Sequence, residues 1–239
     1  MPPLDILGTT PVLIVGQRDV TRGEMWLSNP GGTDIKLESA TITVTLPGGP
    51  ESGPIPLPPD AFVPANGVRR LVIEMGMQPL TAPGSHPASL ALVTSAGNQV
   101  IPASMLIVAV VAPLLVPDRL VFTGVAPSAV VAGTVVVRNQ GNVPIAVGPI
   151  PDETLLEVRA HPRLLAVVIG GAAVVEPGIG LAPAGTATFT NTTPTIGPGS
   201  WGPVDFLLTA PAALAANIHL RALPRIGTER FAVDLLTAP

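Results

Sequence analysis

The sequence predicts an all-β protein made of two tandem β-sandwich domains of about seven strands each. Three observations predict this fold: frequent turn residues, short apolar runs that alternate with a period of two, and an internal repeat. The 239 residues include 30 Pro and 25 Gly, which is too many for long uninterrupted helices. The apolar share of 47% is too high for a charge-rich disordered chain.

The repeat relates the two halves of the chain. Gly23–Ile35 aligns with Gly133–Ile145 at an offset of 110, matching Gly23 with Gly133, Asn29 with Asn139 and Gly31 with Gly141. Two later pairs keep the same order at offsets of 118–119 and 116: 64–67 with 183–185, and 87–94 with 203–209. This period is too long for a solenoid and fits one β-sandwich. We therefore predict domains at 1–115 and 116–239.

Alternating segments between turn signals predict the strands. In residues 40–46, Ile42, Val44 and Leu46 alternate with three threonines, as expected for a half-buried strand. Further strands of the first half are expected at 71–73, 89–93 and 100–111. Those of the second half are expected at 120–122, 134–138, 164–169, 186–190, 205–209, 218–222 and 229–236.

One strand places a tryptophan on the face that points away from the core. In residues 24–28, alternation directs Met25 and Leu27 inward and Trp26 outward, on the side of Glu24 and Ser28. We expect Trp26 to anchor a contact with a neighbouring chain or domain. The alternative is a Trp26 that is covered by loops of its own domain.

The N-terminal segment, residues 4–15, suggests a second contact. It is flanked by Pro, and such a segment can pair with the sheet edge of another subunit. On this hypothesis, Leu4, Ile6, Val12 and Ile14 contact the partner.

The turns that follow two strands resemble those of a known family. Residues 27–31 and 137–141 end a strand in Asn-x-Gly, and residues 63–67 and 181–185 contain a Pro turn that leads into an alternating strand. In this respect the chain resembles bacterial immunoglobulin-like adhesion-type domains, the cell-adhesion-related domains found in bacteria. The resemblance implies a spacer, an adhesive module or an assembly part, and it implies no site residues. The local physics is that Asn bonds nearby backbone while Gly adopts φ > 0.

The sequence contains few residues in patterns typical of catalytic or metal-binding sites. His86, His161 and His219 lie more than 50 residues apart, without the spacing of metal ligands. Residues 198–202 (Pro-Gly-Ser-Trp-Gly) match a nucleophile elbow only loosely, and we interpret them as the turn before the strand at Asp205. We therefore expect no enzyme activity and no cofactor.

One acidic cluster leaves two interpretations open. Asp152, Glu153 and Glu157 supply the oxygen ligands that calcium prefers, but they lack the spacing of known calcium loops. Arg159 and Arg163 lie close in sequence, which favours a solvated acidic edge. No metal site is predicted.

Charge and composition restrict the partners. The net charge is −4 and basic residues are scattered, so nucleic-acid binding is not expected. Residues 75–117 carry no fixed charge, but prolines interrupt them too often for a membrane-spanning helix. No signal peptide is visible at the N-terminus, which favours a cytoplasmic protein or a part of an assembled particle over classical secretion.

These observations predict a non-catalytic structural or assembly protein, a subunit of a larger particle, fibre, shell or surface layer. Charged residues are only 12% of the chain, and low surface charge with apolar patches is typical of contact surfaces. The expected partner is protein, by self-assembly or with another structural subunit. The alternative is a carbohydrate- or calcium-binding adhesion module.

Overall fold

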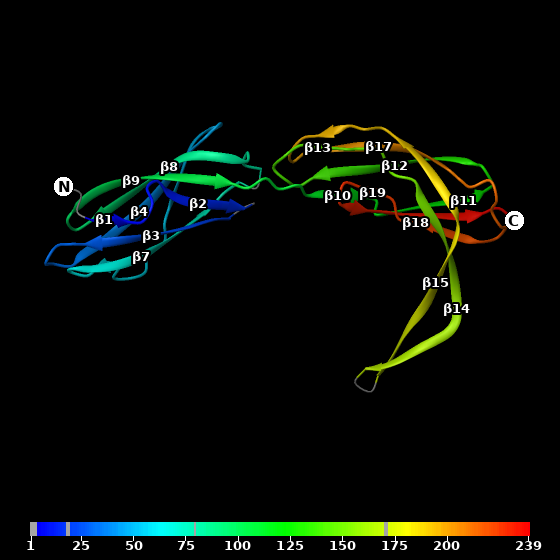
Figure 1. The fold of residues 1–239 in the computed structure, drawn as a ribbon, viewed down its shortest axis with the longest axis horizontal. Coiled ribbons are helices and arrows are strands. Elements are labelled where there is room, and N and C mark those ends of the chain that lie inside the picture. Colours follow the sequence, from blue (N-terminus) through cyan, green and yellow to red (C-terminus); the bar gives the residue numbers. More distant parts are fainter. Residues whose placement is uncertain (1–3, 18–19, 79, 170–171) are drawn as a thin grey trace. The chain divides into compact units, whose positions relative to one another are not determined.

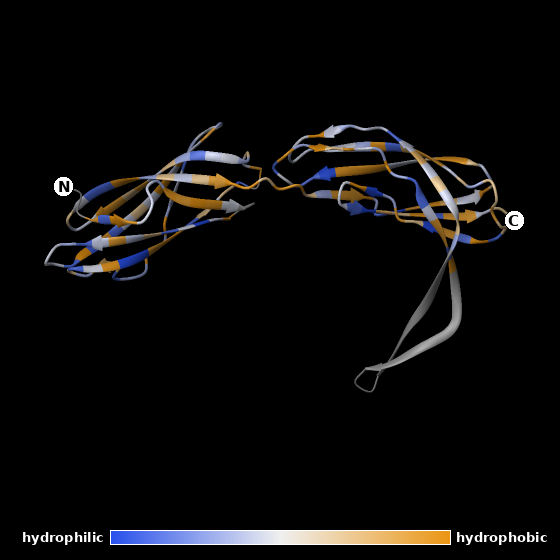
Figure 2. Ribbon diagram, in the orientation of Figure 1, coloured by the Kyte–Doolittle hydropathy of each residue, from blue (hydrophilic) through white to orange (hydrophobic). Residues whose placement is uncertain are grey.

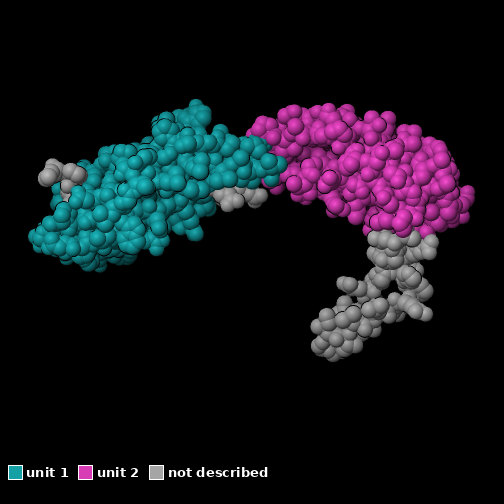
Figure 3. Space-filling view, viewed as in Figure 1, with its two compact units in different colours: residues 1–111, 141–143 teal, residues 112–140, 144–239 magenta. Residues whose placement is uncertain are grey.

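The computed structural model describes residues 4–17, 20–78, 80–169 and 172–239 of the chain. For residue 17 and for the described residues between 159 and 182, it describes the backbone only. The described residues form an all-β protein without helix. They divide into two compact units (Figures 1 and 3): unit 1 is Met1–Val111 with Gly141–Val143, and unit 2 is Ala112–Gln140 with Pro144–Pro239. The predicted domain boundary, after residue 115, lies four residues from the observed division after Val111.

Unit 1 is built around β3, which pairs with β7 on one side and with β1 and β2 on the other. The rest of the sheet continues from β2 in the order β9, β8, β4, β5, and the β2–β9 pairing is parallel. The strands are β1 (Asp5–Leu7), β2 (Val12–Gln17), β3 (Val20–Asn29), β4 (Ile35–Leu46), β5 (Gly49–Pro54), β6 (Phe62–Val63), β7 (Gly67–Gly76), β8 (Gly84–Thr94) and β9 (Gly97–Ile107).

The core of unit 1 collects alternate residues from these strands. Ile42 and Val44 of β4 are buried, as predicted, and so are Leu90 of β8 and Ile101 of β9. Figure 2 shows the resulting alternation of hydrophobic and hydrophilic residues along the strands. Because alternate residues of each strand point inward, their apolar side chains pack into one core.

Unit 2 has the sheet order β10-β12-β17-β15-β14-β18-β21-β11, with a parallel pairing between β11 and β21. Its strands are β10 (Pro113–Val116), β11 (Arg119–Val125), β12 (Val130–Asn139), β13 (Ile145–Ala146), β14 (Glu153–Ile169), β15 (Ala172–Asn191), β16 (Thr195–Ile196), β17 (Trp201–Thr209), β18 (His219–Ala222), β19 (Arg225–Ile226), β20 (Glu229–Arg230) and β21 (Ala232–Thr237).

Aromatic side chains fill the centre of unit 2. Phe206 lies with its ring centroid 5.9 Å from that of Phe189 and 5.7 Å from that of Phe231, in tilted arrangements that aromatic pairs favour. Val135 and Val137 of β12 complete this part of the core.

A buried asparagine at the end of β3 organises the loop that follows. Asn29 donates to the carbonyl oxygens of Thr33 (2.8 Å) and Val63 (3.2 Å), and its Oδ1 accepts from the Gly31 amide (2.9 Å). A Cβ at Gly31 would lie 3.1 Å from Asn29 Oδ1, and Gly31 is not in the left-handed region. The glycine therefore permits close approach, whereas the sequence predicted a positive φ.

Asn139 plays the same part at the end of β12. It is fully buried and donates to the carbonyl oxygen of Ile196 at 3.0 Å. The turns that precede β7 and β17 also match, because Asn66 and Gly199 both have positive φ. The Pro198–Gly202 segment is thus a turn that leads into a strand, as predicted.

These equivalences correct the later part of the predicted repeat. The equivalent of Ile35 is Ile145, a shift of 110, and their partners Val63 and Ile196 are related by a shift of 133. Residues 64–67 therefore match 197–200, whereas the sequence alignment paired them with 183–185. Unit 2 has 23 extra residues in this interval, and a turn followed by an alternating strand occurs too often to reveal such an insertion.

The extra residues lengthen the β14–β15 hairpin. In unit 1 the corresponding β4 and β5 pair over Thr41–Leu46 and close at Gly49. In unit 2 the pairing runs from Glu153↔Ala187 to Ile169↔Ala172. Of the described residues, only Leu156 and Glu157 of β14 pair with β18, and only Thr188–Asn191 of β15 pair with β17.

Replacing Asn29 by Ala tests the loop anchor. We expect the free energy of unfolding of unit 1 to fall by about 2 kcal/mol, because three hydrogen bonds are lost and buried backbone groups are left without partners. Urea denaturation of Asn29→Ala and of the exposed control Asn98→Ala measures this. Equal stability of the two variants would refute the anchoring role.

Candidate contact surfaces

Trp26 points outward from β3, as predicted. Its side chain is 46% exposed, while Met25 and Leu27 on either side are buried. In the sheet register Trp26 lies between Leu7 of β1 and Arg70 of β7. Tryptophan and arginine are among the residue types enriched at energetically important contacts between proteins.

The same outward side of unit 1 carries further apolar residues, which we call the β3 face. Its exposed large apolar members are Leu7, Leu13, Val15, Val20, Trp26, Val68 and Val72. Two ion pairs lie among them, Arg22–Glu74 at 3.0 Å and Arg70–Glu24. Since these pairs are exposed, they contribute little to stability, and they place both signs of charge beside the apolar residues.

The N-terminal residues expected to meet a partner are placed inside unit 1. Leu4, Val12 and Ile14 are buried in its core, and Ile6 packs against that core. Their strands pair with β3 and β9 of the same chain. The residues that alternate with them point the other way, and Leu7, Leu13 and Val15 are exposed at the surface.

Unit 2 has a similar outward side on β10, β12 and β17, which we call the β12 face. Its exposed large apolar residues are Leu114, Val116, Val130, Trp201 and Leu207. Trp201 is 71% exposed and lies opposite Arg138, which in turn lies opposite Leu114. Trp201 was not predicted as a surface residue, although the alternation that buries Val204, Phe206 and Leu208 places it on the outward side.

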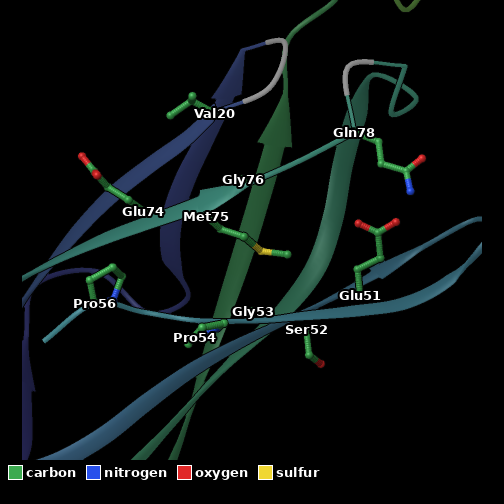
Figure 4. Close-up of a pocket in the computed structure, with 10 residues that line it drawn as sticks. All are labelled: Val20, Glu51, Ser52, Gly53, Pro54, Pro56, Glu74, Met75, Gly76 and Gln78. Carbon is green, nitrogen blue, oxygen red and sulfur yellow. The ribbon is translucent and has the colours of Figure 1, made fainter.

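A hollow lies in unit 1 between β5 and the end of β7 (Figure 4). It is lined by Val20, Glu51, Ser52, Gly53, Pro54, Pro56, Glu74, Met75, Gly76 and Gln78. The Met75 side chain extends toward Gly53, where an added Cβ would lie 3.4 Å from Met75 Cγ. Much of the lining is backbone, because Gly and Pro make up four of the ten residues.

A buried carboxylate joins three strands of unit 2. Asp234 of β21 is fully buried and accepts hydrogen bonds from Arg221 Nε (2.8 Å), from His219 Nε2 (2.8 Å) and from Arg119. The side chains come from β11, β18 and β21, which are neighbours in the sheet. This cluster could not be predicted from the sequence, because its members meet only through the sheet register.

Burial alone would raise the pKa of Asp234, but hydrogen bonds from Arg221, His219 and Arg119 outweigh it and lower that pKa to about 2. The carboxylate in turn raises the pKa of Arg221. With two arginines on one carboxylate, the arrangement serves to bind strands together.

His86 and Asp152 have partners outside this cluster. His86 is buried and bonds to the carbonyl oxygen of Ala82 at 2.9 Å, and the His161 side chain falls outside the described residues. Asp152 Oδ1 accepts from the Phe189 amide at 3.2 Å. Within the described ranges, no three His, Cys, Asp or Glu residues could jointly hold a metal ion, so Asp152, Glu153 and Glu157 are not brought together there as a ligand set.

The chain matches no protein-family profile and no curated protein. Structural comparison finds weak similarity to a DNA glycosylase, AlkC, of Pseudomonas fluorescens (TM-score 0.30, 9% identity, 43% of this chain and 30% of that chain). Red sea bream transglutaminase gives 0.25 at 10% identity, over 99% of this chain and 31% of that chain. The Pseudomonas aeruginosa CupB2 chaperone gives 0.29 at 12% identity, over 96% and 98%.

This chain therefore spans about a third of the length of the glycosylase and of the transglutaminase. All three TM-scores lie below 0.5, so the comparisons establish neither a fold family nor a function. In the part of the chain that the structure describes, no helix has the length and apolar character to cross a membrane.

Asp234→Asn tests the charge cluster. We expect a loss of about 3 kcal/mol at pH 7, because two arginines lose their buried counter-charge. The depressed pKa means that the stabilisation is present above the unfolded-state pKa, near 4, and is lost as the pH falls through about 2. Urea denaturation at pH 7, 4 and 2 should show the difference from wild type shrinking over the last interval.

Asp118→Asn, an exposed aspartate of the same unit, is the matched control and should behave like wild type. A constant difference between Asp234→Asn and wild type down to pH 2 would contradict the assignment.

Proposed function

We propose that the chain is a non-catalytic structural protein that assembles with other protein subunits through the β3 and β12 faces. The observation that carries this proposal is that both tryptophans of the chain lie on these faces, each opposite an arginine on the neighbouring strand. Clustered exposed apolar side chains of this kind usually mark contacts between proteins.

We also propose that each unit is an immunoglobulin-like β-sandwich. Its support in unit 2 is the strand order, because β10-β12-β17-β15 and β14-β18-β21 follow the orders ABED and CFG of the two sheets of a constant-type domain. The parallel pairing of an early strand with the last strand occurs in both units. Domains of this architecture serve many functions, so the role has to be argued from the surfaces.

The distribution of charge supports assembly. The chain has 12 basic and 16 acidic residues among 239, about half of the charged share of an ordinary soluble domain. The two exposed tryptophans, Trp26 and Trp201, are the residue type that contributes most at protein interfaces.

A carbohydrate-binding module is the second candidate, because an exposed indole also provides a stacking surface for sugars. The exposure of Trp201 favours it. Titration of intrinsic tryptophan fluorescence with neutral polysaccharides tests this alternative, and a saturable change that is lost in Trp201→Ala would support it over assembly.

The double variant Trp26→Ala/Trp201→Ala tests assembly through the two faces. We expect at least a tenfold weaker self-association in sedimentation velocity, since losing each buried indole at an interface costs more than about 1.4 kcal/mol. The melting temperature should change little, because both side chains are exposed. Phe62→Ala, an exposed aromatic residue of β6, is the control.

Unchanged association together with a lower melting temperature would contradict the proposal. That result would mean that the two indoles stabilise their own units.

A further inference from the structure

We propose that the β3 face of unit 1 packs against the β3 face of a second copy of this chain. The two copies are related by a two-fold axis that lies in the interface, parallel to the strands and midway between β3 and β7. This inference rests on the proposed function, because it names the partner of one of the two faces. The arrangement of charge on the β3 face supports it.

The outward residues of β3 and β7 form rows across the face, since the two strands run side by side (Figure 1). The four rows pair Arg22 with Glu74, Glu24 with Val72, Trp26 with Arg70, and Ser28 with Val68. A two-fold axis parallel to the strands exchanges β3 with β7 and keeps each row at the same height. Each outward residue of one copy therefore lies opposite its own row partner in the second copy, which makes the contact isologous.

The first row is complementary to itself under this operation. Arg22 of each copy lies opposite Glu74 of the other. Within one copy the same two residues already form an ion pair, with Arg22 Nε 3.0 Å from Glu74 Oε1. The four side chains of the dimer thus alternate in sign, and each charge has two neighbours of opposite sign. Complementary charges of this kind fix the register of a contact.

The ion pair within one copy leaves room for the second one. It uses Nε, which is one of the five N–H donors of the Arg22 guanidinium. The Arg22 side chain is still 76% exposed and that of Glu74 is 47% exposed. Removing water from a charge is costly unless it is well paired, and in the dimer each of these charges gains a second counter-charge.

The third row brings together the residue types that contribute most to binding. Trp26 lies opposite Arg70 of its own sheet and, in the dimer, opposite Arg70 of the second copy. A guanidinium over an indole ring is favourable, and residues that dominate binding tend to pair with each other across an interface. Arg70 also keeps its ion pair with Glu24, so neither charge is buried without a counter-charge.

Apolar side chains border these rows on the side of β1 and β2. Leu7, Leu13 and Val15 are exposed there. Leu13 and Val72 also line a shallow hollow beside the charged side chains, which leaves space for side chains of the second copy. Sheets that pack face to face keep their strands within about 30° of each other, and the two-fold axis parallel to the strands gives this alignment.

The β12 face of unit 2 is a poorer match for the β3 face. The outward charged residues of β12 and β17 are Arg138 and Asp205, and Asp205 Oδ1 already accepts a hydrogen bond from Thr134 at 2.7 Å. The two ion pairs of the β3 face carry four charges, so some of them would meet no opposite charge on the β12 face. A second β3 face offers an opposite charge to both members of the first row.

Charge reversal with mixing tests the arrangement. In a dimer, Arg22→Glu brings four glutamates together and Glu74→Arg brings four arginines together. Each variant alone should therefore self-associate at least roughly tenfold more weakly than wild type in sedimentation velocity. An equimolar mixture at the same total concentration should associate about as strongly as wild type, because each glutamate then faces an arginine of the other variant.

Mixing separates a contact between copies from an effect within one copy. The like charges within each variant stay in place when the variants are mixed, so a purely intramolecular role would give no recovery. The double variant Arg22→Glu/Glu74→Arg restores opposite signs and should associate like wild type. Lys36→Glu and Glu38→Lys, at exposed positions of β4, are the matched controls and should associate like wild type both alone and mixed.

The outcomes separate this inference from the proposed function. Weakened single variants whose mixture shows no recovery would overturn the two-fold contact. If the charge variants associate like wild type while Trp26→Ala/Trp201→Ala does not, the two-fold contact is also wrong, and assembly through the faces stands. If wild type remains monomeric at every concentration, the proposed function fails and the second-copy contact fails with it.

Discussion

Each unit depends on pairing the backbone hydrogen-bonding groups of its strands. A chain with this much Pro and Gly cannot satisfy those groups with long helices. A buried unpaired N–H or C=O costs as much as a lost hydrogen bond. In both units, paired strands satisfy these backbone groups, and residues along each strand alternate between the core and the surface. Strand edges are where the constraint is least fully met, and the two units differ there: β17 has a strand on each side, whereas β7 has β3 alone among the described strands.

The inward residues account for stability and the outward residues for the proposed role. Two separate clusters of buried side chains form the two cores, and buried asparagines at the ends of β3 and β12 fix the loops that lead toward β7 and β17. In unit 2, Asp234 adds a charged link among three strands. None of these features requires the outward Trp26 or Trp201, which supports a role for them beyond the unit that carries them.

Period-two alternation predicted the local features well. It gave the outward direction of Trp26 and the burial of Met25 and Leu27, and the Asn-x-Gly motif predicted side-chain to backbone bonding. The N-terminal segment shows the limit of this approach. Alternation identifies two sets of residues, but it does not say whether Leu4 and Ile14 meet the core of their own chain or a partner.

Features that depend on long-range register could not be predicted. Asp234 and Arg119 are 115 residues apart, and they meet only because β11 and β21 run parallel side by side. The extra residues of the β14–β15 hairpin were hidden because a similar turn and strand recur nearby, which allowed a plausible but non-equivalent alignment of 64–67 with 183–185. The equivalence of Val63 and Ile196 likewise depends on strand pairing, because each pairs with the equivalent isoleucine of its unit, Ile35 or Ile145.

The central claim is that copies of this chain associate with one another, and the native mass of the chain tests that claim most directly. The monomer has a mass of 24.2 kDa. Mass measurement of the unmodified chain over a range of concentrations is predicted to show species of two or more copies that grow with concentration. A single species of 24.2 kDa at every concentration would contradict self-assembly.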